Sequence, residues 1–201
     1  MTKVLAGITT SVDGYITGPD DGPGKGLGEG GERLHYWVFG GPWTYDEPAK
    51  GSSEGPDREY LDEVFAAGGA WIVGRTMHDV VDGWGDDPGF GVSVYVVTHR
   101  PHETVVKGDT TFEFVTDGIH EALERARATA GDKDVIVMGG ADLLRQYLDA
   151  GVVDELTLTI APVILGGGKR LFDGLERTDI AFERFDAIAS PYATHLRYRV
   201  G

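Results

Sequence analysis

Residues 134–144 read DVIVMGGADLL: an apolar run typical of a β-strand, a pair of glycines, and a helical pattern that begins with no linker. Because Gly139 and Gly140 carry no side chains, a ligand can approach the backbone beside the free N–H groups and partial positive charge of a helix N-terminus. Phosphate or pyrophosphate is the ligand that such a helix start binds. A tight strand-to-helix turn without any ligand is the alternative, and the rest of the chain has to decide between them.

Composition restricts the class of protein. A chain of 201 residues suits one domain, residues 1–201, and its net charge of -15 with a pI near 4.6 argues against nucleic acid or an anionic membrane as partner. There is no cysteine, which excludes disulfides and thiolate zinc sites. His99 and His102 form the only close histidine pair and lack a third ligand, so we expect no metal. With no signal peptide and no apolar stretch of about 18 residues, we expect a cytoplasmic protein.

Strand and helix patterns alternate on both sides of the glycine pair. Strand patterns occupy residues 3–9, 70–74, 92–98, 112–115, 135–138 and 155–164, and helical patterns occupy 57–67, 76–81, the residues after Asp117, and those from the glycine pair to Gly151. Two consecutive strands, 180–187 and 194–200, follow. This order predicts a three-layer α/β fold with a mostly parallel central sheet and an antiparallel C-terminal edge.

A glycine-rich and aromatic-rich insertion at about 17–56 interrupts the alternation. Glycine makes up 31 of 201 residues, about twice the usual share of roughly 7%, and much of the excess falls here. The aromatic residues of 36–45, Trp37 and Trp43 among them, argue against a disordered linker. The insertion can be a lid over a site, an oligomer contact or a packed surface loop.

Three predicted strands end in sequences suited to anion binding. Ligands of open α/β sheets bind beyond the carboxyl ends of the strands. Here these ends carry Gly74-Arg75-Thr76, Thr98-His99-Arg100 and Gly139-Gly140, which offer guanidinium, hydroxyl and backbone N–H donors. Three separated anion sites suit a dinucleotide better than a mononucleotide. Solvated salt bridges are the alternative for each arginine.

Five strings, in this order, resemble the dihydrofolate reductase-like superfamily, and most of all the stand-alone relatives of the reductase domain of the bifunctional riboflavin-biosynthesis deaminase-reductase. The strings are TSVDGYI (10–16), WIVGRTMHDV (71–80), VYVVTHRP (94–101), VIVMGGADLL (135–144) and LTIAPVILGGGKRLF (158–172). The resemblance spans nearly the whole chain and implies a dihydrofolate reductase-like fold.

The resemblance also implies NADPH, lying across the strand ends. Gly74, Arg75 and Thr76 would contact its phosphates, and Thr98, His99 and Arg100 would reach the adenosine end with its 2′-phosphate. The glycine pair and the helix start after it would hold the pyrophosphate and nicotinamide side, through Gly139, Gly140, Ala141, Asp142 and Leu143. By the same resemblance, the peptide bond between Gly139 and Gly140 would be cis.

The substrate side is implied less fully. Ser11, Asp13 and Tyr15 would edge the substrate pocket, with Asp13 as a polar contact and candidate proton donor, and Trp37 and Met138 would complete the pocket. Met138 stands where the riboflavin reductases commonly carry a glutamate, and the cysteines of a zinc deaminase are missing, so deamination is excluded. Dihydrofolate reductases place one acid on the helix before the second strand. Four acids crowd that helix here, and the sequence does not choose among Asp57, Glu59, Asp62 and Glu63.

These observations lead to one main functional hypothesis. We expect an NADPH-dependent reductase that transfers a hydride to a small heteroaromatic, pterin-like or pyrimidine-like substrate, similar to 5-amino-6-(5-phosphoribosylamino)uracil reductase or dihydrofolate reductase. A non-catalytic nucleotide- or flavin-binding protein on the same fold is the alternative, and a homodimer that uses the aromatic loop as its contact is compatible with either.

Overall fold

The computed structural model describes residues 2–47 and 49–201, and nine strands of this part of the chain form one sheet in the order β4-β5-β3-β2-β6-β1-β7-β9-β8. The strands are β1 (Val4–Ser11), β2 (Gly68–Gly74), β3 (Ser93–Val97), β4 (Val105–Lys107), β5 (Thr110–Val115), β6 (Asp134–Gly139), β7 (Glu155–Ala161), β8 (Phe182–Ala189) and β9 (Thr194–Val200). All neighbouring pairs from β5 to β7 are parallel, and the pairs β7·β9, β8·β9 and β4·β5 are antiparallel.

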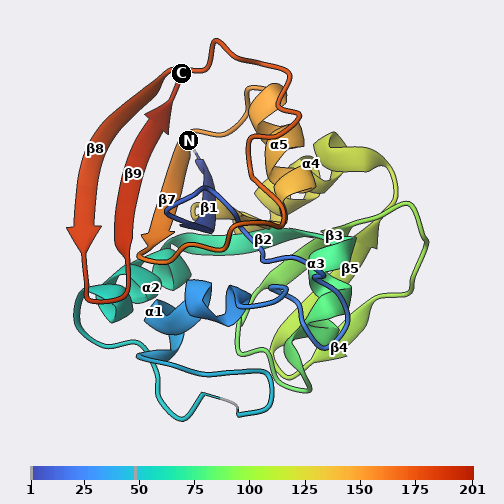
Figure 1. The fold of residues 1–201 in the computed structure, drawn as a ribbon. Coiled ribbons are helices and arrows are strands. Elements are labelled where there is room, and N and C mark those ends of the chain that lie inside the picture. Colours follow the sequence, from blue (N-terminus) through green and yellow to red (C-terminus); the bar gives the residue numbers. More distant parts are fainter. Residues whose placement is uncertain (1, 48) are drawn as a thin grey trace.

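Helices cover both faces of this sheet. They are α1 (Tyr36–Phe39), α2 (Gly55–Ala67), α3 (Arg75–Val80), α4 (Gly118–Ala130) and α5 (Ala141–Asp149), with short 3-10 helices at Gly31–His35 and Asp82–Trp84. Figure 1 shows α4 and α5 on one face and α1, α2 and α3 on the other. The predicted three-layer fold, mostly parallel with an antiparallel C-terminal edge, is confirmed. The second antiparallel edge, β4, was missed because three residues carry too little pattern to read.

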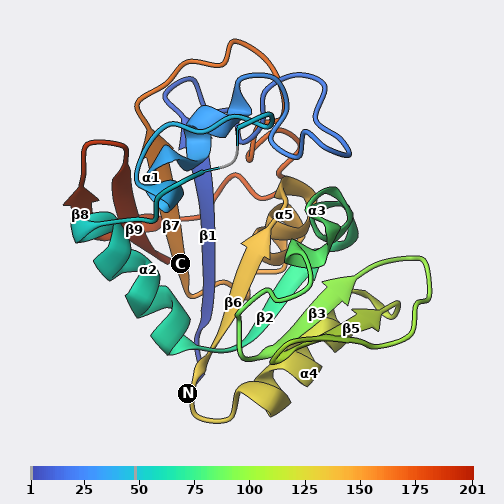
Figure 2. The ribbon, with the colours of Figure 1, turned by 90° about the horizontal axis from the view of Figure 1, so that it is seen from below.

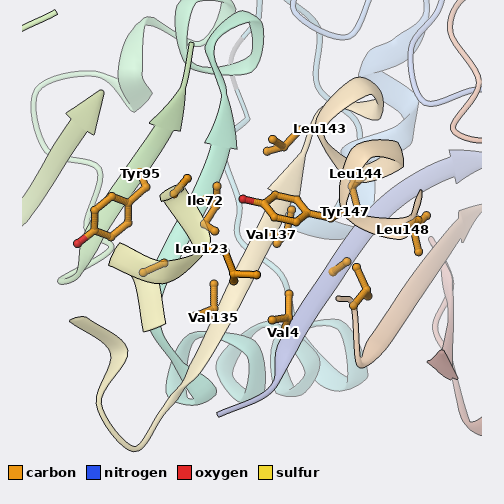
Figure 3. Packing of buried hydrophobic residues seen from close by; sticks show 14 of the residues in the cluster. Val4, Ile72, Tyr95, Leu123, Val135, Val137, Leu143, Leu144, Tyr147 and Leu148 are labelled. Carbon is orange, nitrogen blue, oxygen red and sulfur yellow. The ribbon is translucent and has the colours of Figure 1, made fainter. Parts of the chain in front are cut away.

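The face under α4 and α5 holds the larger hydrophobic core. Leu144, Tyr147 and Leu148 of α5 are almost fully buried, and Figure 3 shows them lying over residues of β1, β2 and β6. The Tyr147 hydroxyl donates a hydrogen bond to the backbone carbonyl of Ile119 at 2.8 Å, which ties α5 to α4. This packing fixes the start of α5 at the carboxyl end of β6.

Alternation along β6 sends its side chains to two separate cores. Val135 and Val137 belong to the core under α5, whereas Ile136 and Met138 pack on the opposite face with Trp71 of β2. The period of two that defines a strand therefore directs Met138 away from the α5 side.

The start of β2 shows why glycines follow α2. A Cβ atom on Gly69 would lie 2.6 Å from the backbone oxygen of Ala130, the last residue of α4. The glycine lets the strand pass that close to the end of the helix. Helix α2 stops at Ala67, as the sequence predicts, but the strand begins at Gly68, two residues earlier than expected.

The insertion at 17–56, of which Pro48 lies outside the described residues, packs against the sheet. It contains the 3-10 helix Gly31–His35 and α1, and Figure 2 shows it gathered at the carboxyl ends of β1 and β6. Trp37 is buried against Tyr60 and Ala193. The described part of the insertion is therefore packed and carries helices, as its aromatic residues predict, while the lid and the oligomer contact stay predictions.

Candidate functional site

A cleft of about 980 Å³ runs along the carboxyl ends of the parallel strands. Ten of the eleven residues predicted to bind the cofactor line it: Gly74, Arg75, Thr76, Thr98, His99, Arg100, Gly140, Ala141, Asp142 and Leu143. The eleventh, Gly139, is buried and does not line the cleft, and its peptide bond with Gly140 is cis, as the resemblance implies. The structure therefore brings three separate sequence segments together in one cleft.

The first end of the cleft is the start of α5. Gly140 is the N-cap residue, and no side chain caps this helix, so its first N–H groups have no partner within the helix. A Cβ atom placed on Gly140 would meet nothing within 4 Å, which means that the glycine faces open space. An anion can therefore approach the helix start from the cleft.

The ends of β2 and β6 meet beside this helix start. A Cβ atom on Gly74 would lie 3.7 Å from both the Gly139 oxygen and the Gly140 nitrogen. The backbone of Gly74 thus forms one continuous surface with the glycine pair. Arg75 and Thr76 extend this surface toward β3.

The far end of the cleft is cationic. The Arg75 Nε donates to Asp79 Oδ1 at 2.6 Å, and the Arg100 Nη2 donates to Asp79 Oδ2 at 2.9 Å, so both guanidinium groups share one carboxylate. Arg75 also lies over the ring of Phe114, 5.2 Å from its centroid. The Thr98 hydroxyl accepts a hydrogen bond from the Arg100 backbone N–H at 3.0 Å, which shapes the turn after β3.

The charge of the lining differs from that of the whole chain. Five basic side chains line the cleft and three acidic ones do, although the chain as a whole carries a net charge of -15. The basic residues are Arg75, Arg100, Arg145, Lys169 and Arg170, and the acidic ones are Asp21, Asp142 and Asp173. This local excess of positive charge favours an anionic ligand.

The segment Ser11–Tyr15 does not line the cleft. The Asp13 carboxylate accepts hydrogen bonds from the backbone N–H groups of Leu165 and Gly166, at 3.2 and 2.8 Å. A hydrogen bond from the Ser11 side chain, together with these backbone N–H groups, lowers the pKa of Asp13 to about 2. The ionised Asp13 therefore connects the loop after β1 to the loop that contains Leu165 and Gly166. We do not retain it as the proton donor. Tyr15 lies outside the lining, its ring under the Arg170 guanidinium at 4.4 Å.

Trp37 and Met138 also lie away from the cleft. The Trp37 Nε1 donates to the Thr9 hydroxyl at 3.1 Å, and the ring packs against Tyr60 and His195. Met138 belongs to the core on the opposite face. Trp37 therefore contacts a residue of the lining, Thr9, without lining the cleft itself, and Met138 forms no part of the cleft wall.

The residues that do line the β1 end were missed by the sequence analysis. They are Ile8, Thr9, Ile16, Thr17 and His35. Burial lowers the pKa of His35 to about 4, so its imidazole is neutral at pH 7. A signal was present in the sequence, because His35 opens the aromatic run HYWVF. The direction of its ring could not be read from that run.

The acids of α2 take structural positions. Asp57 is buried and accepts a hydrogen bond from His195 Nε2 at 2.9 Å, while His195 Nδ1 lies 2.8 Å from the Thr159 hydroxyl. Asp62 and Glu63 pair with arginines at the surface. Among the described residues, no acid of α2 lines the cleft.

Residues 2–47 and 49–201 contain neither a cluster of metal ligands nor a membrane-spanning helix. No group of three or more histidine, aspartate or glutamate side chains is placed to hold a metal ion. No helix combines the length and apolar character that a membrane crossing needs.

Comparison with known proteins agrees with the fold. The family model of the RibD C-terminal domain matches residues 2–192. The uncharacterized protein YyaP of Bacillus subtilis is 31% identical over 181 residues, which cover 85% of this chain and 80% of YyaP.

Two solved structures have the same fold at low identity. A proposed riboflavin biosynthesis protein from Shewanella sp. PV-4 superposes with a TM-score of 0.71 at 20% identity, covering 100% of this chain and 99% of the other. A dihydrofolate reductase from Enterococcus faecalis, solved with NADP(H) and RAB-propyl, gives 0.57 at 15% identity, covering 99% and 96%. Because the family model matches residues 2–192, nearly the whole chain, the chain belongs to the RibD C-terminal domain family.

Proposed function

We propose that this protein is an NADPH-dependent reductase that transfers a hydride to a C=N or C=O carbon of a small heteroaromatic, pterin-like or pyrimidine-like substrate. The observation that carries the proposal is the single cleft that joins the open start of α5 to Arg75 and Arg100. Its volume of about 980 Å³ lies at the upper end of the roughly 300–1,000 Å³ usual for small-molecule sites.

The two ends of the cleft suit the two anionic parts of the cofactor. The N–H groups at the start of α5 would bind the pyrophosphate, and Gly140 leaves room for it. Arg75 and Arg100 would bind the 2′-phosphate, because paired guanidinium groups favour a phosphate dianion. From β6 to β3 the sheet spans two strand spacings, about 10 Å, a distance that a dinucleotide covers.

The β1 end of the cleft would hold the substrate. The bound cofactor supplies the hydride, and the protein supplies orientation and exclusion of water. The Thr9 and Thr17 hydroxyls and the neutral His35 imidazole offer hydrogen bonds to a polar heterocycle. Ile16 and Leu27 add apolar walls from the loop after β1 and the insertion. Water would supply the proton, because the Asp13 carboxylate is bound to the backbone of Leu165 and Gly166 and does not line the cleft.

Binding and turnover test the proposal. Saturating NADPH should raise the thermal unfolding temperature and change the fluorescence of the purified protein. Oxidation of NADPH should then follow with a member of a panel of dihydropterins, aminopyrimidines and quinone-like acceptors. If NADPH has no effect while NADH or a flavin binds, the cofactor assignment is wrong.

A non-catalytic nucleotide- or flavin-binding protein is the second candidate. The two ends of the cleft differ in a way that favours this candidate. The cationic end carries both Arg75 and Arg100, whereas no acid of α2 lines the end proposed for the substrate. Tight nucleotide binding with no oxidation of NADPH across the whole panel would support this candidate. Turnover of any one compound would exclude it.

A further inference from the structure

Asp79 joins the two arginines of the cationic end without lining the cleft itself. It lies on α3 four residues after Arg75, and its second oxygen meets Arg100, which comes from the loop after β3. His78 Nδ1 is also 3.2 Å from the carboxylate. One carboxylate therefore serves as counter-ion to both guanidinium groups.

Asp79 is ionised at neutral pH. Partial burial acts to raise its pKa, but the hydrogen bonds from Arg75 and His78 and the charge of Arg75 outweigh this and hold the pKa below its usual value. The arginine pair thus has a net charge of about one when the carboxylate is included, instead of two.

This charge bears on the choice between two cofactors, and the inference rests on the proposed function. A 2′-phosphate is the group that distinguishes NADPH from NADH, and it would bind to the same guanidinium groups that Asp79 already neutralises. The carboxylate repels the phosphate and leaves the uncharged 2′-hydroxyl of NADH almost unaffected. We propose that Asp79 is a specificity-determining residue whose negative charge weakens NADPH binding and narrows the preference for NADPH over NADH.

The exposure of the ion pairs separates this role from a purely structural one. The side chain of Arg100 is 69% exposed, that of Asp79 is 37% exposed and that of Arg75 is 21% exposed. Surface pairs of this kind contribute about 0–1 kcal/mol to stability. We therefore expect variants at Asp79 to fold, and their thermal unfolding temperatures check this before their Kd values are compared.

The test is the substitution Asp79→Asn, which removes the charge and keeps an acceptor oxygen for the arginines. We expect the Kd of NADPH to fall about tenfold, the effect of removing one charge about 6 Å from a dianion in a largely aqueous setting, while the Kd of NADH changes less than about twofold. The fragments 2′,5′-ADP and 5′-ADP should show the same contrast. Asp62→Asn is the matched control, because it removes the acid of another i,i+4 arginine pair, on α2.

The possible results distinguish a failure of the Asp79 inference from a failure of the proposed function. An unchanged ratio of the two Kd values would overturn the inference. A selective loss of NADPH affinity would also overturn it, because the carboxylate would then act by orienting the arginines, and Asp79→Ala should show a still larger loss. If the unmodified protein binds neither nucleotide, the proposed function itself fails, and the inference fails with it.

Discussion

At the scale of single residues, Arg100 carries the most specific prediction. Its guanidinium is mostly exposed and bonded only to Asp79 among the described side chains, so it is free to meet a phosphate. The substitution Arg100→Ala should raise the Kd of NADPH by tenfold or more, the usual value of a lost hydrogen bond to a charged group, and that of NADH less than about threefold. Fluorescence titration of both cofactors checks this, with Arg58→Ala on α2 as the control. Equal losses for both cofactors would assign Arg100 a structural role.

Two neutral histidines predict how stability depends on pH. Burial lowers the pKa of His35 to about 4 and lowers the pKa of His195 against the opposing effect of Asp57. The unfolded chain binds protons near pH 6.5 that the folded chain does not, so the free energy of unfolding should fall as the pH drops from about 6.5 toward 4. We expect a loss of about 2 kcal/mol from His35.

Urea unfolding at pH 7, 5.5 and 4.5 measures this effect. The free energy of unfolding of His35→Gln should change less between pH 7 and 4.5 than that of the unmodified protein. Substitution of His195 should reduce the remaining change further. A free energy of unfolding that is constant from pH 7 to 4.5 would show that these imidazoles are accessible to protons in the folded state.

The positions of single residues in the cleft could be predicted from the sequence only where the course of the backbone determines them. Gly140 and the arginines follow strands, and the ends of parallel strands meet at one edge of the sheet. Asp13 shows the limit. Its partners Leu165 and Gly166 lie about 152 residues away in the chain, and no local pattern shows that its carboxylate turns toward them. The same holds for Trp37, whose partner is Thr9.

At the scale of elements, β6 and α5 together form the part of the cleft that we expect to bind the pyrophosphate. Gly140→Ala tests whether its open helix start binds the cofactor. The φ of Gly140 is -71° and an added Cβ would touch no protein atom within 4 Å, so we expect an almost unchanged unfolding temperature. The methyl group would instead enter the cleft, and NADPH affinity should fall tenfold or more.

Gly22→Ala is the matched control for this substitution. Its Cβ would likewise meet nothing within 4 Å, and Gly22 does not line the cleft. Calorimetric titration with NADPH compares the two variants. Unimpaired binding by a folded Gly140→Ala protein would place the cofactor away from the helix start.

Elements were predictable where a pattern is long. The alternation of β7 and the apolar stripe of α5 were sufficient, since Leu144, Tyr147 and Leu148 fall on one helix face. The three-residue strand β4 and the short helices within 17–56 escaped prediction. Their conformations depend on contacts with the sheet more than on local propensity.

At the scale of the whole molecule, the position of Trp37 shows whether this side chain packs within one chain or contacts a second copy. Its ring is 7% exposed and contacts Tyr60, His195 and Thr9 of the same chain, so it is not available to a second copy. The homodimer stays a prediction, and light scattering should give twice the chain mass of 21.6 kDa. Trp37→Ala should leave that mass unchanged and lower the free energy of unfolding by about 3–5 kcal/mol. A change in mass alone, with stability preserved, would place Trp37 at a subunit contact.

The arrangement of the whole sheet explains how an acidic protein presents a cleft with an excess of basic side chains. Parallel strands β1, β6, β2 and β3 bring their carboxyl ends to one edge, and the insertion at 17–56 gathers beside that edge (Figure 2). The acidic residues are mostly elsewhere on the surface, and the lining keeps an excess of basic side chains. The order of the strands thus places basic side chains in the cleft, away from most of the acidic residues.

A crystal structure of the protein with NADPH tests the central claim most directly. The account predicts density for the pyrophosphate at the start of α5 beside Gly140, and for the 2′-phosphate between Arg75 and Arg100. Density at another surface, or a cleft that stays empty at saturating NADPH, would contradict it.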